Sequence, residues 1–340
     1  MKAFRLHGPG LEHARLDTIE PPRCLPGHAL IRVRAATLNY RDLAIAQGKM
    51  PLQVAWPVIP CSDFAGEIIA IDAPQSGLRV GQRVSAHYVQ GWIDGPPRVA
   101  DTATNLGIPG PGVLAQTICL PARGLLPLPD DLDDASAACL PVAGVTAWNA
   151  IMRSEIDPCD RTIVIQGTGG VALFGLQIAH AAGAHTIVLT SSEQRAALAR
   201  SLGADHTIDY RALPDWHERV IELTAGAGAD LILDVAGGAN LARSLKAAAT
   251  GGVIACCGFL DGMRAQFDVP DLLMRSLRVR GIRVGSREHH LQLLAFCQRR
   301  RIKPVIGQRH RLADARAGFE ALAAAAHVGK IVIDFDDAAT

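Results

Sequence analysis

Residues 161–179 read Arg-Thr-Ile-Val-Ile-Gln-Gly-Thr-Gly-Gly-Val-Ala-Leu-Phe-Gly-Leu-Gln-Ile-Ala, and this stretch decides the fold. It predicts a buried β-strand over Thr162–Gln166, a glycine turn, and a helix that starts near Val171. Backbone N–H groups and the positive end of the helix dipole then face outward, where they bind a pyrophosphate. We therefore predict a dinucleotide site formed by Gly167, Thr168, Gly169, Gly170 and Val171.

The chain around this loop alternates between strand-like and helix-like segments from about residue 131 to residue 285. Such alternation indicates a parallel sheet with helices on both faces, which is the doubly wound Rossmann arrangement of an α/β protein. A sixth, edge strand is predicted over 278–284. The other predicted strands are Thr162–Gln166, Thr186–Thr190, His206–Ile208, Leu231–Val235 and Val253–Cys257.

Residues 1–130 have a different pattern, with short strand-like runs separated by Pro and Gly turns. They predict a β-rich domain. The last segment, 286–340, contains a predicted helix over Asp314–Ala326 and a strand over Lys330–Phe335, and we expect it to pack back on the first domain. Within the long Gly/Pro-rich loop of residues 91–112, Trp92 is either a pocket residue or an anchor for the loop.

The tip of the second Rossmann strand distinguishes NAD from NADP. NAD-binding proteins usually place an acidic residue there, which binds the ribose 2′-hydroxyl. This chain has Thr190, Ser191 and Ser192 instead, followed by Arg195. Hydroxyl groups and a guanidinium suit the dianionic 2′-phosphate, so we predict NADP(H) as the cofactor.

Composition excludes several other classes of protein. The net charge of +1 does not favour general nucleic-acid binding, and the eleven Lys/Arg residues between Arg275 and Arg311 are interpreted as a solvated surface. No apolar run is long enough to span a membrane. The eight cysteines form no C-x-x-C pair, and the N-terminus has no apolar signal region. We therefore expect a cytoplasmic protein.

Several short motifs along almost the whole chain resemble those of the medium-chain dehydrogenase/reductase superfamily. Within it, the chain resembles the zinc-free quinone oxidoreductases and alcohol-dehydrogenase-like proteins. Besides the glycine loop, the motifs are Leu38-Asn-Tyr-Arg-Asp42, Gly66-Glu67, Val80-Gly-Gln-Arg-Val84, Gly144-Val-Thr-Ala-Trp148, Gly203-Ala-Asp-His-Thr-Ile-Asp-Tyr210 and Gly329-Lys-Ile-Val-Ile333.

The resemblance implies a GroES-like catalytic domain (1–130, completed by 286–340), a Rossmann domain (131–285) and a homodimer formed through edge strands. It implies that Tyr210 and Arg195 contact the 2′-phosphate, and that Thr146 and Asn39 lie near the nicotinamide. Lys330 falls near the cofactor in several relatives. The predicted cofactor residues also include Gly258 and Phe259.

The chain departs from zinc-dependent relatives at the three metal-ligand positions, which are occupied by Asn39, Ser62 and a residue near Val142. The four-cysteine structural zinc lobe is also missing, since residues 91–112 contain no cysteine. A substitute site of Cys61, Asp63 and His87 lacks ligand spacing, so these are interpreted as ordinary loop and strand residues. We predict that the protein needs no zinc.

Without a Lewis-acid metal, one oriented hydrogen bond supplies about 2.7–4 kcal/mol of transition-state stabilisation. That suits reduction of an activated acceptor by NADPH, such as a quinone or an α,β-unsaturated carbonyl compound. Tyr40 is the candidate proton donor beside Asn39 and Asp42, although it could instead be a packed aromatic, and Arg41 and Asp42 a structural ion pair. The alternatives are a zinc-type alcohol dehydrogenase and a non-catalytic NADPH sensor.

Overall fold

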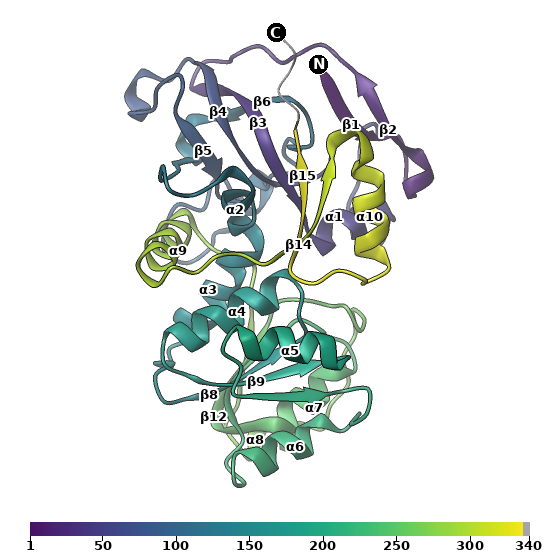
Figure 1. Cartoon of the computed structure of the whole chain (residues 1–340), viewed down its shortest axis with the longest axis vertical. Coiled ribbons are helices and arrows are strands. Elements are labelled where there is room, and N and C mark those ends of the chain that lie inside the picture. Colours follow the sequence, from purple (N-terminus) through teal and green to yellow (C-terminus); the bar gives the residue numbers. More distant parts are fainter. Residues whose placement is uncertain (336–340) are drawn as a thin grey trace. The chain divides into compact units, whose positions relative to one another are not determined.

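The computed structural model describes residues 1–335, except for the side chain of Thr102. The chain divides into two compact units. Unit 1 comprises Met1–Val142, Gly285–Leu294 and Lys303–Thr340, and unit 2 comprises Ala143–Val284 and Ala295–Ile302. Figure 1 shows a β-rich first unit and a second unit in which strands and helices alternate. Each unit is described by itself below.

Unit 2 contains a six-stranded parallel sheet in the order β10-β9-β8-β11-β12-β13. The first strand of the unit, β8, lies at the centre, with β9 and β10 added on one side and β11 to β13 on the other. This order confirms the predicted Rossmann fold. The central strand is buried on both faces, since Ile163, Val164 and Ile165 are at most 1% exposed. The strands are β8 (Thr162–Gln166), β9 (His185–Thr190), β10 (His206–Asp209), β11 (Ala229–Asp234), β12 (Ala248–Cys256) and β13 (Arg278–Gly281).

Helices cover both faces of this sheet. Helices α3 to α5 pack on one face, and α6 to α8 pack on the other (Figure 1). The edge strand is shorter than the predicted range 278–284, because β13 ends at Gly281 and Val284 takes a positive φ of 48°. The helices are α3 (Val145–Met152), α4 (Gly170–Ala181), α5 (Glu193–Ser201), α6 (Trp216–Leu223), α7 (Asn240–Ala247) and α8 (Val269–Leu273).

Unit 1 is built on a largely antiparallel sheet in the order β14-β15-β3-β4-β5-β7, with β6 paired to β3. Its sheet confirms the predicted β-rich first domain. Strand β15 lies between β14 and β3, so a segment near residue 330 is hydrogen bonded to one near residue 38. The strands are β1 (Lys2–Leu6), β2 (Ala14–Thr18), β3 (His28–Leu38), β4 (Asp63–Ile71), β5 (Arg83–Ala86), β6 (Thr117–Pro121), β7 (Leu125–Pro127), β14 (Ile306–Arg311) and β15 (Lys330–Asp334).

The core of unit 1 is filled by aromatic and branched side chains from these strands and from α10. Phe4 and Phe319 stack with ring centroids 5.8 Å apart, and Phe64 is fully buried. Burial of these rings stabilises the packing of the C-terminal helix against unit 1. The helices are α1 (Tyr40–Ala46), α2 (Asp134–Ala138), α9 (Arg287–Arg300, of which the residues up to Leu294 belong to unit 1) and α10 (Ala315–Ala323).

Among residues 1–335, no helix is long and apolar enough to cross a membrane.

Short 3-10 and π-helical turns connect many of the strands and helices. The turns are 3-10 helices at Leu11–His13, Pro74–Ser76, Val99–Thr104, Ala122–Gly124 and Leu312–Asp314, and a π-helix at Leu140–Gly144.

Candidate functional site

The glycine loop joins the centre of the Rossmann sheet to helix α4. Gly167 has a φ of +82°, a conformation that L side chains rarely adopt, and Gly169 is the N-cap of α4. A Cβ at either position would have no neighbour within 4 Å, so the space above the loop is open. The loop and the N-terminus of α4 therefore form a cradle for a phosphate group at the carboxyl edge of the sheet.

Arg195 lies in the first turn of α5, after β9, and is hydrogen bonded to the glycine loop. Its Nη1 donates a hydrogen bond to Thr168 Oγ1 over 2.9 Å. The side chain of Ser192 caps α5 by accepting from the Arg195 backbone N–H. Glu193 is paired with Arg200 on the exposed side of α5, so its carboxylate is engaged away from Arg195.

Tyr210 follows β10, and its backbone N–H donates to the carbonyl of Thr190 at the end of β9. Its side chain is 40% exposed, whereas Thr190 is buried. The predicted 2′-phosphate residues therefore come together at the ends of three neighbouring strands, β8, β9 and β10. The structure brings them to one sheet edge, as a nucleotide site requires.

A buried hydrogen-bond network fixes the next loop along this edge. Gln166 Nε2 donates to Ser244 Oγ over 2.9 Å, and Ser244 Oγ donates to Asp234 Oδ2 over 2.7 Å. The other oxygen of Asp234 accepts from Gly237 N. Gly258 follows β12 and has no room for a side chain, because a Cβ would lie 2.2 Å from Val235 O. The loops after β11 and β12 are thus in close contact.

The remaining predicted cofactor residues are spread over both units. Phe259 lies next to Gly258 in unit 2. Thr146 also belongs to unit 2, near the start of α3, and is 4% exposed. Lys330 belongs to unit 1, where it lies beside the predicted catalytic residue Asn39.

In unit 1 the polar residues gather around one carboxylate, that of Asp63 at the start of β4. Asp63 is fully buried, and its Oδ2 accepts from Asn39 Nδ2 at 3.0 Å and from Val142 N at 3.3 Å. Its Oδ1 accepts from Ser62 Oγ at 3.2 Å. The resemblance described above implies that these three donors lie at or near metal-ligand positions of zinc-dependent relatives. Thr37 adds a longer contact of 3.5 Å to Oδ2.

Lys330 supplies the positive charge in this cluster. Its ammonium donates to Asn39 Oδ1 at 2.6 Å and to Leu38 O at 2.8 Å, and it lies 3.7 Å from Asp63 Oδ2. The side chain is only 3% exposed. Burial raises the pKa of Asp63, while the nearby ammonium and the hydrogen bonds from Asn39 and Val142 lower it. A buried charge of each sign is therefore matched within the unit.

Asp42 and Tyr40 stand at the first turn of α1. The Asp42 carboxylate accepts a hydrogen bond from the Asn39 backbone N–H over 2.9 Å, which caps the helix. Burial raises the pKa of Asp42 to about 6, partly offset by Arg41. Tyr40 is half-buried against the core of unit 1. Their catalytic roles stay predictions, since the geometry shows a capping role for Asp42 and a packing role for Tyr40.

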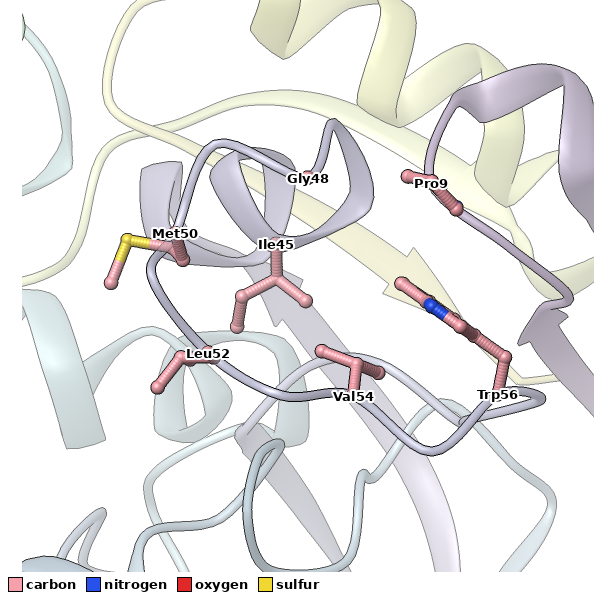
Figure 2. A pocket seen from close by; sticks show the side chains of 7 residues that line it. All are labelled: Pro9, Ile45, Gly48, Met50, Leu52, Val54 and Trp56. Atoms are coloured by element: carbon pink, nitrogen blue, oxygen red, sulfur yellow. The ribbon is translucent and has the colours of Figure 1, made fainter.

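The far end of α1 borders an apolar pocket. Figure 2 shows the loop that follows α1 curving around Ile45, with Trp56 and Pro9 at one side. The pocket and the polar cluster therefore share one short helix, with the polar residues at its start and the apolar residues at its end. The pocket is lined by Pro9, Ile45, Gly48, Met50, Leu52, Val54 and Trp56.

Comparison with known proteins places this arrangement in a family. The description "Alcohol dehydrogenase GroES-like domain" matches residues 25–130, and "Zinc-binding dehydrogenase" matches residues 170–299. A zinc-type alcohol dehydrogenase-like protein of Schizosaccharomyces pombe is 34% identical over 335 residues, which cover 96% of each chain. The chain belongs to the medium-chain dehydrogenase/reductase superfamily.

Solved structures of this superfamily agree. A Sinorhizobium meliloti 1021 protein described as an alcohol dehydrogenase has a TM-score of 0.90 and 39% identity, with 98% of both chains covered. An NAD-dependent alcohol dehydrogenase has a TM-score of 0.88 and 27% identity, with coverage of 98% and 99%. This superfamily member is therefore an alcohol dehydrogenase-like, NAD(P)-dependent oxidoreductase. The comparisons name zinc-type relatives, so membership of the zinc-free quinone oxidoreductase branch stays a prediction.

The residues at the family's metal position do not fit a zinc ion. Among residues 1–335, no group of three or more His, Cys, Asp or Glu side chains could hold a metal. Asn39, Ser62 and Val142 offer a carboxamide, a hydroxyl and an alkyl group, and Lys330 brings a competing cation. Burial holds the pKa of the Cys61 thiol well above its usual range. Cys61, Asp63 and His87 do not form such a group among the described residues either.

Sequence reasoning missed the role of Asp63, which it named only as part of a doubtful metal set. It also missed the contact between Lys330 and Asn39. One signal was available, since Asp63 directly follows Ser62, which the resemblance places at a metal-ligand position. Trp92 is settled as an anchor for its loop, because its Nε1 donates to Gly95 O and its ring packs edge-on to His289.

Unit 1 also buries two histidines, His87 and His290, of which the sequence singled out only His87. His290 is fully buried, and neither ring nitrogen has a hydrogen-bond partner among the described residues. Burial lowers the pKa of His290 to about 3 and that of His87 to about 4, and each is further lowered by Arg287. Both rings are therefore neutral in the folded protein at physiological pH.

These histidines predict a loss of stability in acid. Below pH ~6.5 the two histidines bind protons in the unfolded chain but stay neutral in the folded protein. The free energy of unfolding therefore falls as the pH drops from about 6.5 toward their folded pKa values. Asp42 acts with the opposite sign, because its folded pKa of about 6 lies above its ordinary value. Replacing His290→Leu should make the decline between pH 6 and 4 shallower by about 1.4 kcal/mol per pH unit.

Urea unfolding of both proteins across this pH range measures the slope, and the contribution of Asp42 cancels in the difference. Leu16→Ala, at the exposed surface of unit 1, removes no titratable group and is the control, which should leave the slope unchanged. Parallel pH profiles for the protein and His290→Leu would contradict the assignment.

Proposed function

We propose that the chain is a zinc-independent oxidoreductase that uses NADPH to reduce an activated acceptor, a quinone or an α,β-unsaturated carbonyl compound. The observation that supports the proposal is the hydrogen bonding of the residues at the expected metal-ligand positions. Asn39 and Ser62 donate through their side chains, and Val142 through its backbone N–H, to the single carboxylate of Asp63, while the carbonyl oxygen of Asn39 accepts from the Lys330 ammonium. A site of this kind can donate hydrogen bonds but offers no Lewis acid.

The residues of each unit would contribute differently. The glycine loop and α4 bind the pyrophosphate, and Arg195, Ser191, Ser192 and Tyr210 surround the 2′-phosphate. When bound, the reduced nicotinamide supplies a hydride. The acceptor gains that hydride at carbon, its C=O electron pair moves onto oxygen, and a proton follows from Tyr40 or water. In an enone the hydride adds at the β-carbon and the proton at the α-carbon.

The names of the relatives favour the alternative, a zinc-type alcohol dehydrogenase acting on an alcohol or aldehyde. The two functions differ in their need for metal. For the main proposal we expect far less than one zinc per chain by elemental analysis, and NADPH-dependent turnover of quinones or 2-alkenals that resists chelators.

About one zinc per chain, with chelator-sensitive oxidation of simple alcohols, would establish the alternative. Inactivity toward quinones, 2-alkenals, enoyl thioesters and alcohols alike would point to the third function, a sensor that binds NADPH without turnover. Metal content and the acceptors that are turned over differ for each function, so each result separates one function from the other two. All the assays use the same preparation.

The preference for NADPH over NADH is also a proposal, and the NAD-dependent relative shows that it needs a test. Arg195 carries it, since its guanidinium is held against Thr168 in the glycine loop. Replacing Arg195→Gln should weaken NADPH binding about tenfold through loss of a charge-assisted hydrogen bond, with little change for NADH.

Titrating protein fluorescence with each nucleotide measures both affinities. Arg200→Gln is the matched control on the same helix, since Arg200 pairs with Glu193 instead. Tighter binding of NADH than NADPH by the unmodified protein, or equal weakening of both by Arg195→Gln, would exclude the NADPH preference.

A homodimer through the edge of the Rossmann sheet is the proposed assembly. Strand β13 ends the sheet, and exposed apolar side chains gather beside it: Leu273 is 66% exposed, Met274 82% and Val279 44%. An open strand edge with apolar neighbours favours pairing with a second copy. A cytoplasmic location is proposed as well, in keeping with eight free cysteines.

Replacing Val279→Lys should convert the dimer to a monomer, because the charge would be buried without a partner in the joined edge. Light scattering after size-exclusion chromatography measures the mass. Leu213→Lys alters a side chain of similar exposure, 49%, in the segment after β10, and should keep the dimer. A Val279→Lys protein of unchanged dimer mass would rule out this interface.

A further inference from the structure

We propose that Lys330 and Asp63 clamp the carboxamide of Asn39, so that its second N–H donates a hydrogen bond to the substrate oxygen in place of a metal ion. The inference rests on the proposed function and names the electrophilic group of that reaction. Asn39 is the catalytic residue, since it would touch the substrate. Lys330 and Asp63 act through it as positioning residues.

The clamp contacts both ends of the carboxamide. Lys330 Nζ donates to Asn39 Oδ1 at 2.6 Å, and Asn39 Nδ2 donates to Asp63 Oδ2 at 3.0 Å. An ammonium can only donate hydrogen bonds, and an ionised carboxylate can only accept them. A flipped amide would set N–H against the ammonium and oxygen against the carboxylate, so the partners fix its orientation.

One donor of this amide remains. The Nδ2 group carries two hydrogens, and only the one directed to Asp63 has an acceptor among residues 1–335. Lys330 is 3% exposed and Asp63 fully buried, whereas Asn39 is half-buried. Asn39 is therefore the member of the trio that a ligand can reach. The ammonium on its oxygen draws electron density from the amide and strengthens the remaining N–H as a donor.

The backbone sets this geometry. In the antiparallel pairing of β15 with β3, Ile331 lies opposite Leu38, which places Lys330 beside Asn39. Gly329 precedes the lysine with a φ of +59°, and a Cβ there would lie 2.1 Å from Val305 O. The lysine is thus delivered by a tight turn and a strand, both rigid elements, and not by a mobile loop.

During reduction the acceptor oxygen gains negative charge as the hydride forms the new C–H bond and the C=O electron pair moves to oxygen. The free N–H of Asn39 would stabilise that charge most strongly in the transition state. The clamp keeps the carboxamide from rotating toward water as the charge develops. A proton from Tyr40 or solvent then completes the product.

The test compares Asn39→Ala, Lys330→Met and Lys330→Arg in steady-state assays with a series of acceptors of falling reactivity. Loss of the donor in Asn39→Ala should lower kcat about a hundredfold with KM within about threefold. Lys330→Met should lower kcat by tenfold or more, and Lys330→Arg should restore part of it. Lys2→Met, which removes a surface lysine bonded to Thr18, is the control.

A readout beyond overall activity separates positioning from structural support. In Lys330→Met the kcat for the least reactive acceptor should fall more than that for the most reactive one, because weaker polarisation matters most there. Equal loss across the series would show a merely structural lysine and overturn the clamp. If Lys330→Met fails to fold by circular dichroism, Lys330→Arg and Asn39→Ala decide by the same comparison.

The two levels of inference fail differently. Turnover in the unmodified protein with Asn39→Ala within about threefold of it would overturn the clamp and leave the proposed function standing. Absence of turnover with every acceptor would overturn the proposed function, and the clamp with it. One bound zinc per active chain would also overturn the clamp, since the metal would then be the electrophile.

Discussion

The buried carboxylate of Asp63 is the constraint on which the polar interior of unit 1 depends. A carboxylate without solvent needs donors and a countercharge, and an unpaired one would cost several kcal/mol. Asn39, Ser62, Val142 and the ammonium of Lys330 together meet that need. The orientation of Asn39 depends on this carboxylate, and the polar cluster that surrounds it is unsuited to a metal ion.

Unit 2 differs from unit 1, because its charged partner is expected to be a bound nucleotide and not a residue of the chain. Its carboxyl edge is kept rigid by Gln166, Ser244 and Asp234, which are buried and hydrogen bonded to one another. The open space above Gly167 and Gly169 is bordered by this rigid frame. Preformed sites of this kind lose little entropy on binding, which favours affinity for a nucleotide.

Much of the fold could be predicted because its signals are local. The glycine loop, the alternation of strands and helices and the β-rich first domain each occupy a continuous stretch of sequence, and all were confirmed. The end of the edge strand was predicted wrongly, because the positive φ of Val284 has no signature in a run of β-forming residues.

The candidate site was harder to predict. The cofactor residues were predicted from the glycine pattern and the family resemblance, and their roles stay predictions. The contact between Lys330 and Asn39, 291 residues apart, forms only through strand pairing. No periodicity or spacing encodes that contact. The sequence shows which residues stand at the expected metal-ligand positions. Only the structure shows that these residues share one hydrogen-bond partner, the carboxylate of Asp63.

The late position of β15 in the chain links chemistry to folding. Strand β3 pairs with β4 early in the sequence and brings Asp63 toward the interior, but the countercharge arrives only when β15 adds beside β3. The countercharge of this buried carboxylate therefore comes from a segment near the other end of the described chain. A protein shortened before β15 would leave Asp63 without its cation and Asn39 without the donor to its carbonyl oxygen.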